Sequence, residues 1–61
     1  MDRLLHTDME AAELLNQSRA TIWKLMKAGE LASVKIGRSR RIPAAALRDF
    51  VERLTAAQVT G

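Results

Sequence analysis

The sequence predicts a small, mainly α-helical domain with one β-hairpin, in the order helix, turn, helix, hairpin, helix. Three observations indicate this fold class. A helix-capping motif spans residues 7–10, the apolar residues change from helical to alternating spacing before residue 34, and an apolar helical stripe follows Pro43. With 61 residues the chain forms one domain, in which we expect residues 4–54 to be the core and 55–61 a loose tail.

The first helix is predicted over residues 8–15. Thr7 and Glu10 match the capping box, in which the Thr7 hydroxyl accepts from the Glu10 amide and the Glu10 carboxylate accepts from the Thr7 amide. Asn16 suits the left-handed position that ends a helix. The leucines at 4–5 predict a short extended lead-in or a hydrophobic staple.

The second helix is predicted over residues 19–28, after a turn at 16–18. Ser18 is its N-cap candidate, and Gly29 suits the position just past its end. A short turn between two short helices, the second of them basic, is typical of a helix-turn-helix. The core-facing stripe of this helix follows the i, i+3, i+4 spacing and consists of Ile22, Leu25 and Met26.

A basic hairpin and a third helix complete the chain. Residues 34–36 alternate in polarity, residues 37–40 predict a turn, and residues 41–42 return as a second short strand. Pro43 fits the first position of a helix that we expect over 44–54, with fraying towards Ala57. The apolar stripe of this helix is Leu47, Phe50, Val51 and Leu54.

These elements together predict a winged helix-turn-helix with a two-stranded wing. Its core is expected to use every apolar stripe of the sequence, which argues against a module that docks on a membrane or a protein partner. The predicted core residues are Leu5, Ala12, Leu15, Ile22, Leu25, Met26, Leu31, Val34, Ile36, Ile42, Leu47, Phe50, Val51 and Leu54.

Composition argues against several classes of function. The absence of cysteine excludes disulfides and thiolate zinc sites, and a single histidine, His6, cannot form a His-only metal site, so we expect it on the surface or near the cap. No apolar run suits a transmembrane span or a signal peptide. The sequence offers no catalytic set of residues and no Gly-rich phosphate loop. We therefore expect a cytoplasmic binding module without a metal, a cofactor or catalytic residues.

The positive charge is concentrated in the middle of the chain. Residues 1–18 carry a net charge of −3, residues 19–41 carry +6 and residues 42–61 carry zero. A central basic patch on a chain with a pI of about 10.2 is typical of a protein that binds a polyanion. The alternative is a solvated surface with scattered cations.

The outward face of the second helix carries the residues expected to enter the major groove. Arg19, near the N-terminal end that usually reaches base edges, suits bidentate pairing with guanine, and Ala20 or Thr21 suits a thymine methyl group. The alternative is a solubilising outer face. The predicted recognition-helix contacts are Ser18, Arg19, Ala20, Thr21, Trp23, Lys24 and Lys27. Of these, the lysines suit phosphates, and Trp23 is either a packing residue or half-packs on the hairpin with its indole N–H towards a phosphate.

The hairpin is the second basic patch. Its compact cationic tip suits the DNA backbone or an adjacent minor groove, where arginine is attracted to narrow A·T tracts. The alternatives are a solvated turn and, for Lys35, protection of an edge strand. The predicted wing contacts are Lys35, Arg38, Ser39, Arg40 and Arg41.

Three runs in order, 5–15, 18–31 and 34–43, resemble the excisionase-family DNA-binding domain, a winged helix-turn-helix related to the DNA-binding heads of mercury-resistance-type regulators. The resemblance covers residues 4–54. The chain departs from the family at Asn16 and Gln17, where a glycine and an apolar residue are usual. The resemblance implies that the second helix lies in the major groove and the hairpin is a wing on the minor groove.

The resemblance also implies two functions. Excisionases are recombination directionality factors, not enzymes: they bind adjacent sites, bend DNA and help a phage integrase to excise. The expected partners are therefore double-stranded DNA, neighbouring copies of the chain and a phage integrase, with no small-molecule effector. The alternative is a small stand-alone transcriptional regulator of the same fold.

Overall fold

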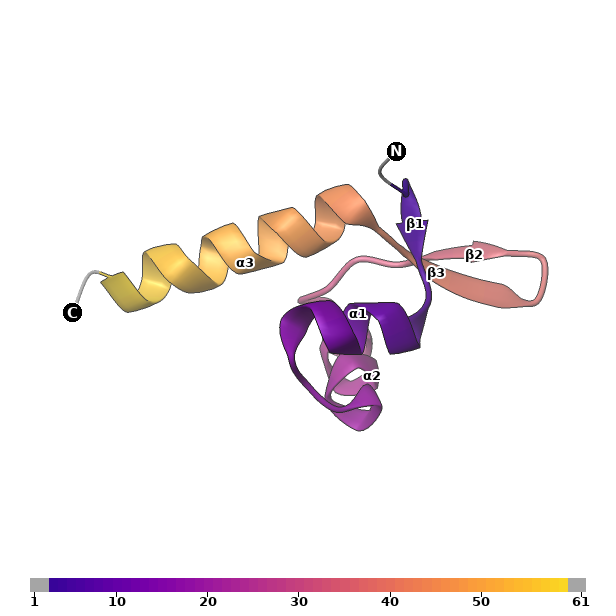
Figure 1. Cartoon of the computed structure of the whole chain (residues 1–61), viewed down its shortest axis with the longest axis horizontal. Coiled ribbons are helices and arrows are strands. Elements are labelled where there is room, and N and C mark those ends of the chain that lie inside the picture. Colours follow the sequence, from indigo (N-terminus) through magenta and orange to yellow (C-terminus); the bar gives the residue numbers. More distant parts are fainter. Residues whose placement is uncertain (1–2, 60–61) are drawn as a thin grey trace.

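The computed structural model describes residues 3–59, within which three helices and three short strands follow one another (Figure 1). The order is the predicted one with a strand added before the first helix. The elements are β1 (Leu5–His6), α1 (Asp8–Leu15), α2 (Arg19–Lys27), β2 (Val34–Ile36), β3 (Ser39–Pro43) and α3 (Ala44–Val59).

Helix α1 begins and ends at the predicted residues. The Thr7 hydroxyl accepts from the Glu10 amide at 3.1 Å, and the Glu10 carboxylate accepts from the Thr7 amide at 3.0 Å, which completes the capping box. Asn16 takes the left-handed conformation with φ 55°. The Gln17 amide then donates to the Ala12 carbonyl at 2.8 Å, so Asn16 ends the helix as the usual glycine would.

Helix α2 is also capped as predicted. Its N-cap is Ser18, whose hydroxyl accepts from the Thr21 amide at 3.1 Å. The helix ends at Lys27, one residue before the predicted end, because Ala28 is its C-cap. Gly29 follows with φ +79°, a left-handed conformation that a residue with a Cβ adopts only under strain.

The three strands form one antiparallel sheet in the order β1-β3-β2. The predicted extended lead-in is β1, which pairs His6 with Ile42 and adds a third strand that the sequence did not predict. Leu4, just before it, is exposed, so the staple interpretation is wrong for that residue.

The turn of the hairpin is shorter than predicted. Ser39 pairs with Ile36 and Arg40 pairs with Lys35, so Ser39 and Arg40 belong to β3 and only residues 37–38 form the turn. Gly37 has φ +61°, which suits the first position of a two-residue type II′ turn. This turn type matches the twist of the flanking strands, which explains why the longer turn does not form.

Helix α3 differs from the prediction at both ends. Pro43 is the last residue of β3 instead of the first helical residue, and the Ala44 amide donates to the Leu4 carbonyl at 2.9 Å. The helix runs to Val59, beyond the predicted end at 54, because the added residues include strong helix formers. The expected loose tail is thus helical up to Val59, and residues 60–61 lie outside the described part of the chain. In Figure 1, α3 extends away from α1 and α2.

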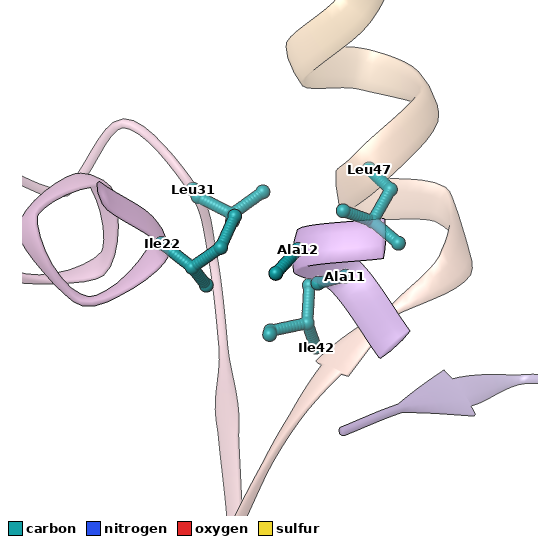
Figure 2. Packing of buried hydrophobic residues seen from close by; sticks show 6 residues of the cluster. All are labelled: Ala11, Ala12, Ile22, Leu31, Ile42 and Leu47. Carbon is teal, nitrogen blue, oxygen red and sulfur yellow. The ribbon is translucent and has the colours of Figure 1, made fainter. Parts of the chain in front are cut away.

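The core is small and lies where α1, α2, β3 and the start of α3 meet (Figure 2). Leu15, Leu25, Met26, Ala46 and Phe50 pack around it and are partly buried. The residues buried within it are Ala11, Ala12, Ile22, Leu31, Ile42 and Leu47. Of these, only Ala11 lies outside the predicted core.

Four residues of the predicted core are exposed instead. Val34 pairs with Arg41 and Ile36 with Ser39, so their side chains lie on the face of the hairpin opposite the buried Ile42. The other two, Val51 and Leu54, lie on the part of α3 that extends from the core. The expectation that every apolar stripe is used by the core is therefore wrong.

Candidate nucleic-acid interface

The outward face of α2 presents most of the predicted recognition residues. Ile22 is fully buried and turns the helix so that Arg19, Ala20, Lys24 and Lys27 are exposed. The helical period explains the placement of Ala20, Lys24 and Lys27, which lie away from the stripe that contains Ile22, whereas Arg19 is exposed as the first residue of the helix. The exposed surface of α2 is basic and lacks acidic side chains of its own.

Two of the predicted contacts at the start of α2 have structural partners. The Ser18 hydroxyl caps the helix and lies 3.0 Å from the Thr21 hydroxyl. Thr21 is half-buried and lines a hollow with Leu25 and Phe50 on another side of the helix. Thr21 therefore does not lie with the basic residues of α2.

Asp8 of α1 accepts hydrogen bonds from two residues of α2. Its Oδ2 accepts from Arg19 Nε at 3.2 Å, from Arg19 Nη2 at 2.9 Å and from the Trp23 indole N–H at 3.1 Å. Its Oδ1 accepts from the Met9 amide at 2.9 Å. The bond from Arg19 is the main cause that holds the pKa of Asp8 below its usual value, with smaller lowering by Trp23 and Met9 against the opposing effect of burial. Asp8 is not among the site residues predicted from the sequence.

Trp23 itself remains 42% exposed. In the free protein its indole N–H donates to the Asp8 carboxylate, whereas one of the two predicted roles had this N–H facing a phosphate. The i, i+4 spacing of Arg19 and Trp23 places both side chains on one stripe of α2, where one carboxylate reaches both. That spacing, opposite an acidic first turn of α1, is the signal in the sequence that points to Asp8.

The cations of the wing lie on three parts of the hairpin. Arg38 is exposed in the turn, and Lys35 lies directly opposite Arg40 on the face that also carries the buried Ile42. Like charges directly opposite each other destabilise a hairpin. Arg40 also donates to the Ser33 hydroxyl at 2.9 Å.

The other two predicted wing residues lie on the opposite face of the hairpin. Ser39 and Arg41 are both half-buried there, and Arg41 Nη1 donates to the Arg40 carbonyl at 3.2 Å. The structure therefore does not bring Arg41 to the side that faces α2.

Helix α2 and the wing meet at one hollow of about 340 Å³. Trp23, Met26 and Lys27 line it from α2, and Arg40 lines it from β3. The fold thus brings together two basic patches that lie apart in the sequence. We call the exposed cations of these two elements the basic face, which consists of Arg19, Lys24, Lys27, Lys35, Arg38 and Arg40.

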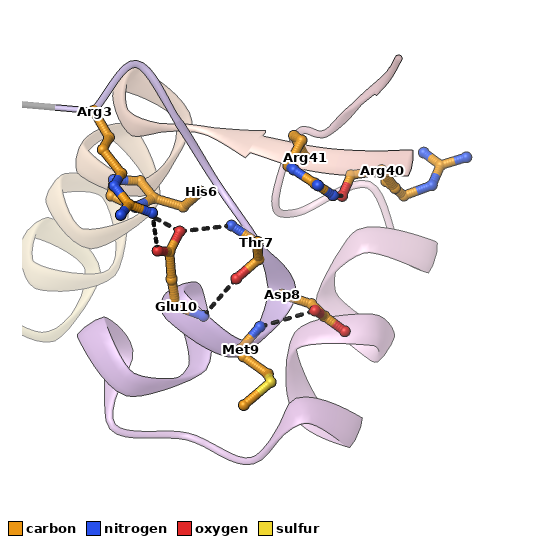
Figure 3. A network of polar contacts seen from close by, with 8 residues as sticks. All are labelled: Arg3, His6, Thr7, Asp8, Met9, Glu10, Arg40 and Arg41. Carbon is orange, nitrogen blue, oxygen red and sulfur yellow. Dashed lines mark hydrogen bonds and ion pairs between the residues drawn. The ribbon is translucent and has the colours of Figure 1, made fainter. Parts of the chain in front are cut away.

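A second polar network lies at the start of α1, beside the basic face (Figure 3). Glu10 accepts from Thr7, pairs with Arg3 and lies 3.5 Å from His6 Nδ1. The Thr7 amide is the main cause that holds the pKa of Glu10 below its usual value. His6 thus lies near the cap as expected. Figure 3 shows Asp8 on the side of α1 that faces α2, away from this network.

Residues 3–59 contain no group of three or more His, Asp or Glu side chains that could hold a metal ion. None of the helices in this range is long and apolar enough to cross a bilayer.

Sequence comparisons identify relatives of this chain among known proteins. The chain is 46% identical over 57 residues to a Saccharopolyspora erythraea protein named "Probable excisionase", an alignment that covers 93% of this chain and 58% of the relative. It is 42% identical over 48 residues to proteins from two strains of Mycobacterium tuberculosis named as DNA-binding proteins, covering 79% of this chain and 62% of each relative. No solved structure matches significantly.

The chain therefore spans about three fifths of the length of these relatives. A family model described as a helix-turn-helix domain matches residues 8–55, which contain α1, α2, the wing and most of α3. On the capped helices, the short turn and this match, the chain belongs to the excisionase-type helix-turn-helix family.

Proposed function

We propose that this chain binds double-stranded DNA, with α2 in the major groove and the wing against the adjacent backbone or minor groove. The observation that carries the proposal is the shared hollow of Trp23, Lys27 and Arg40, which makes the helix and the wing one continuous basic face. A DNA duplex presents a groove flanked by phosphates, so a protein surface with a protruding helix and a flanking basic hairpin fits it.

The placement of each cation supports a division of contacts. Arg19 and Ala20, at the N-terminal end of α2, are the residues we assign to base edges. Lys24 and Lys27 lie further along the helix, where phosphates of the groove walls are closer. The wing contacts that we assign to phosphates or the minor groove are Lys35, Arg38, Ser39, Arg40 and Arg41.

We propose further that the DNA-binding activity is that of an excisionase, an architectural protein without catalysis or cofactor that acts on DNA in the cytoplasm. The "Probable excisionase" relative supports this assignment. A single module of this kind buries only about 600–1,000 Å² on DNA, so one copy binds weakly at physiological salt. Adjacent copies that contact each other, bend the DNA and engage an integrase are therefore part of the proposal.

An apolar surface supports contact between adjacent copies. Leu14, which is 62% exposed, and the exposed Leu54 line a hollow of about 420 Å³ between α3 and the first two helices, together with Phe50 and Val51. Helix α3 carries two arginines and two acidic residues, so its charges do not repel a second copy as the basic face does. We assign this surface to a neighbouring copy on the DNA.

Titration of two duplexes at two salt concentrations tests the proposal. One duplex has random sequence, and the other is the attachment region of the mobile element that encodes the protein. We expect weak, salt-sensitive binding to the first and a cooperative ladder of complexes on the second. Absence of binding to both duplexes at low salt would overturn the whole proposal. Independent binding on the attachment region would overturn the excisionase assignment alone.

A variant separates contact between copies from contact with DNA. Leu54→Asp should abolish the cooperativity and retain the affinity of a single complex, because Leu54 lies on α3 away from the basic face. Leu4→Asp is the control, since Leu4 is an exposed leucine outside the hollow. If both variants bind as cooperatively as the original chain, the apolar surface does not join the copies.

The alternative is a small stand-alone transcriptional regulator. The Mycobacterium tuberculosis relatives, whose names state DNA binding only, favour keeping it. A regulator would select a promoter operator from genomic fragments instead of the attachment region. Sequencing the fragments that the protein retains therefore distinguishes the two functions.

A further inference from the structure

Asp8 is the one acidic residue within residues 3–59 that forms a hydrogen bond or an ion pair with the basic face. Glu10, Asp8 and Asp49 each form an ion pair with an arginine. The Asp8 side chain is the least exposed carboxylate of the three at 21%, against 32% for Glu10 and 65% for Asp49. It is also the only one of them that bonds to α2. A carboxylate beside a surface that binds a polyanion weakens phosphate binding. The position of Asp8 therefore indicates a role other than phosphate binding.

The geometry leaves the base-reading edge of Arg19 available. Asp8 occupies Nε and one position on Nη2, which form one edge of the guanidinium group. The Nη1 donors and the second N–H of Nη2 form the end of the fork, and these two nitrogens can donate together to guanine O6 and N7. The Trp23 indole N–H donates to the same Oδ2, so this one oxygen of Asp8 binds both Arg19 and Trp23.

The contact also neutralises Arg19 locally. A free arginine at this place would bind any phosphate within reach, whereas a paired arginine gains less from a phosphate because the Asp8 carboxylate stays beside it. The same pairing restricts the side-chain rotamers, so less conformational entropy is lost when Arg19 meets a base edge. The orientation of Arg19 and the partial neutralisation of its charge therefore both favour binding to a matching DNA sequence over binding to random sequence.

We propose that Asp8 is a specificity-determining positioning residue, which orients Arg19 and Trp23 for base recognition and withholds Arg19 from the phosphate backbone. This inference rests on the proposed function. It concerns a residue of α1, outside the recognition helix and the wing.

Asp8→Asn tests the proposal with Glu13→Gln as its matched control. Both variants remove one negative charge from α1, but Glu13 is exposed and its side chain has no hydrogen bond or ion pair to α2. The probes are a random-sequence duplex and the duplex that the original chain selects from a random pool. We expect Asp8→Asn to bind random duplex more tightly than Glu13→Gln does, with a salt slope steeper by about 0.9 for one added phosphate contact. The ratio of selected to random affinity should fall about tenfold.

The fluorescence of Trp23, the only tryptophan, provides a readout that needs no DNA. Asp8→Asn should change its emission because the charged acceptor of the indole N–H is lost, and Glu13→Gln should leave it unchanged. If circular dichroism shows that Asp8→Asn is unfolded, Asp8→Ser takes its place. Serine keeps a polar side chain in the first turn of α1 but lacks the carboxylate that pairs with Arg19, so random binding should tighten and selectivity should fall as for Asp8→Asn.

The outcomes separate this inference from the proposed function. If the original chain selects no duplex, the proposed function fails even where the emission change confirms the Asp8 contact. If the original chain is selective and Asp8→Asn keeps both its affinity ratio and its salt slope, the inference about Asp8 is overturned and DNA binding stands.

Discussion

Arg38 is the cation from which the clearest effect on the DNA backbone contact is expected. It lies exposed in the two-residue turn of the wing, and its side chain has no hydrogen bond or ion pair with another residue of the described range 3–59. Arg38→Ala therefore removes one positive charge without removing a structural contact. The turn conformation depends on the preceding Gly37, which is unchanged.

The size of the effect follows from counterion release. Each phosphate neutralised contributes about 0.9 to the slope of log affinity against log salt. Between about 50 and about 200 mM salt, one contact accounts for a roughly 3.5-fold change in affinity. Arg38→Ala should therefore lower the affinity for all duplexes alike. Between the two salt concentrations, the affinity of this variant should fall by a factor about 3.5 times smaller than the affinity of the original chain does.

Fluorescence anisotropy titrations of a random-sequence duplex at these two salt concentrations measure the effect. Arg53→Ala is the control, because it removes the same charge from α3, where Arg53 pairs with Asp49 and donates to the Glu30 carbonyl. Its salt slope should match that of the original chain. The reasoning is refuted if Arg38→Ala retains the original slope, or if Arg53→Ala loses as much.

Three further predictions concern the framework that holds the basic face. Ile22→Ala should lower the free energy of unfolding by about 2–5 kcal/mol, a large part of the stability of so small a domain, whereas Ile22→Val should cost about 0.5–1.5 kcal/mol; urea unfolding measures both. Thr7→Ala breaks the capping box and should cost about 1 kcal/mol by the same assay, and a loss below a few tenths would contradict the capping account. The lowered pKa values of Asp8 and Glu10 mean that their contributions are present above their unfolded-state pKa values and are lost as the pH falls through the folded ones, so thermal stability should decline below about pH 4.5. Asp8→Asn and Glu10→Gln should each flatten that decline, and an unchanged acid profile would contradict the assigned contacts.

The helices were predictable because their boundaries depend on local chemistry. Thr7, Ser18, Asn16 and Gly29 each act through bonds to residues within a few positions, so the sequence alone contains the information. The third helix shows the limit of this approach. Its predicted end at residue 54 followed the end of the apolar stripe, but helix propagation needs no apolar residue, and residues 55–59 continue it.

The sheet was less predictable because register is a non-local property. Alternation at Val34 and Ile36 shows that one face of the strand is apolar, but which face covers the core depends on where β3 pairs. The observed register buries Ile42, places the exposed Lys35 and Arg40 on the same face of the hairpin, and puts the two apolar residues of β2 on the other face. Pairing of β1 with β3 likewise depends on residues far apart in the chain.

The same distinction holds for the candidate interface. Basic residues on α2 and on the wing were identifiable from their charge, and the hollow between Trp23 and Arg40 brings the two elements together. The role of Asp8 in the interface was not predicted from the sequence, because it depends on residues far along the chain. An acidic residue in the first turn of a helix is common, since the helix dipole stabilises a negative charge there. Only the packing of α1 on α2 gives its carboxylate a second set of partners.

The arrangement of charges in the free protein itself favours a polyanionic ligand. Lys35 and Arg40 are held directly opposite each other on β2 and β3, and Lys27 lines the same hollow as Arg40. Proximity of like charges lowers the stability of the free hairpin, and a phosphate placed between them removes that repulsion. Arg19 differs, since Asp8 already balances its charge. Any phosphate that binds the wing therefore relieves repulsion between its cations. Arg19 instead binds most favourably to a base edge whose acceptors match its Nη1 and Nη2 donors.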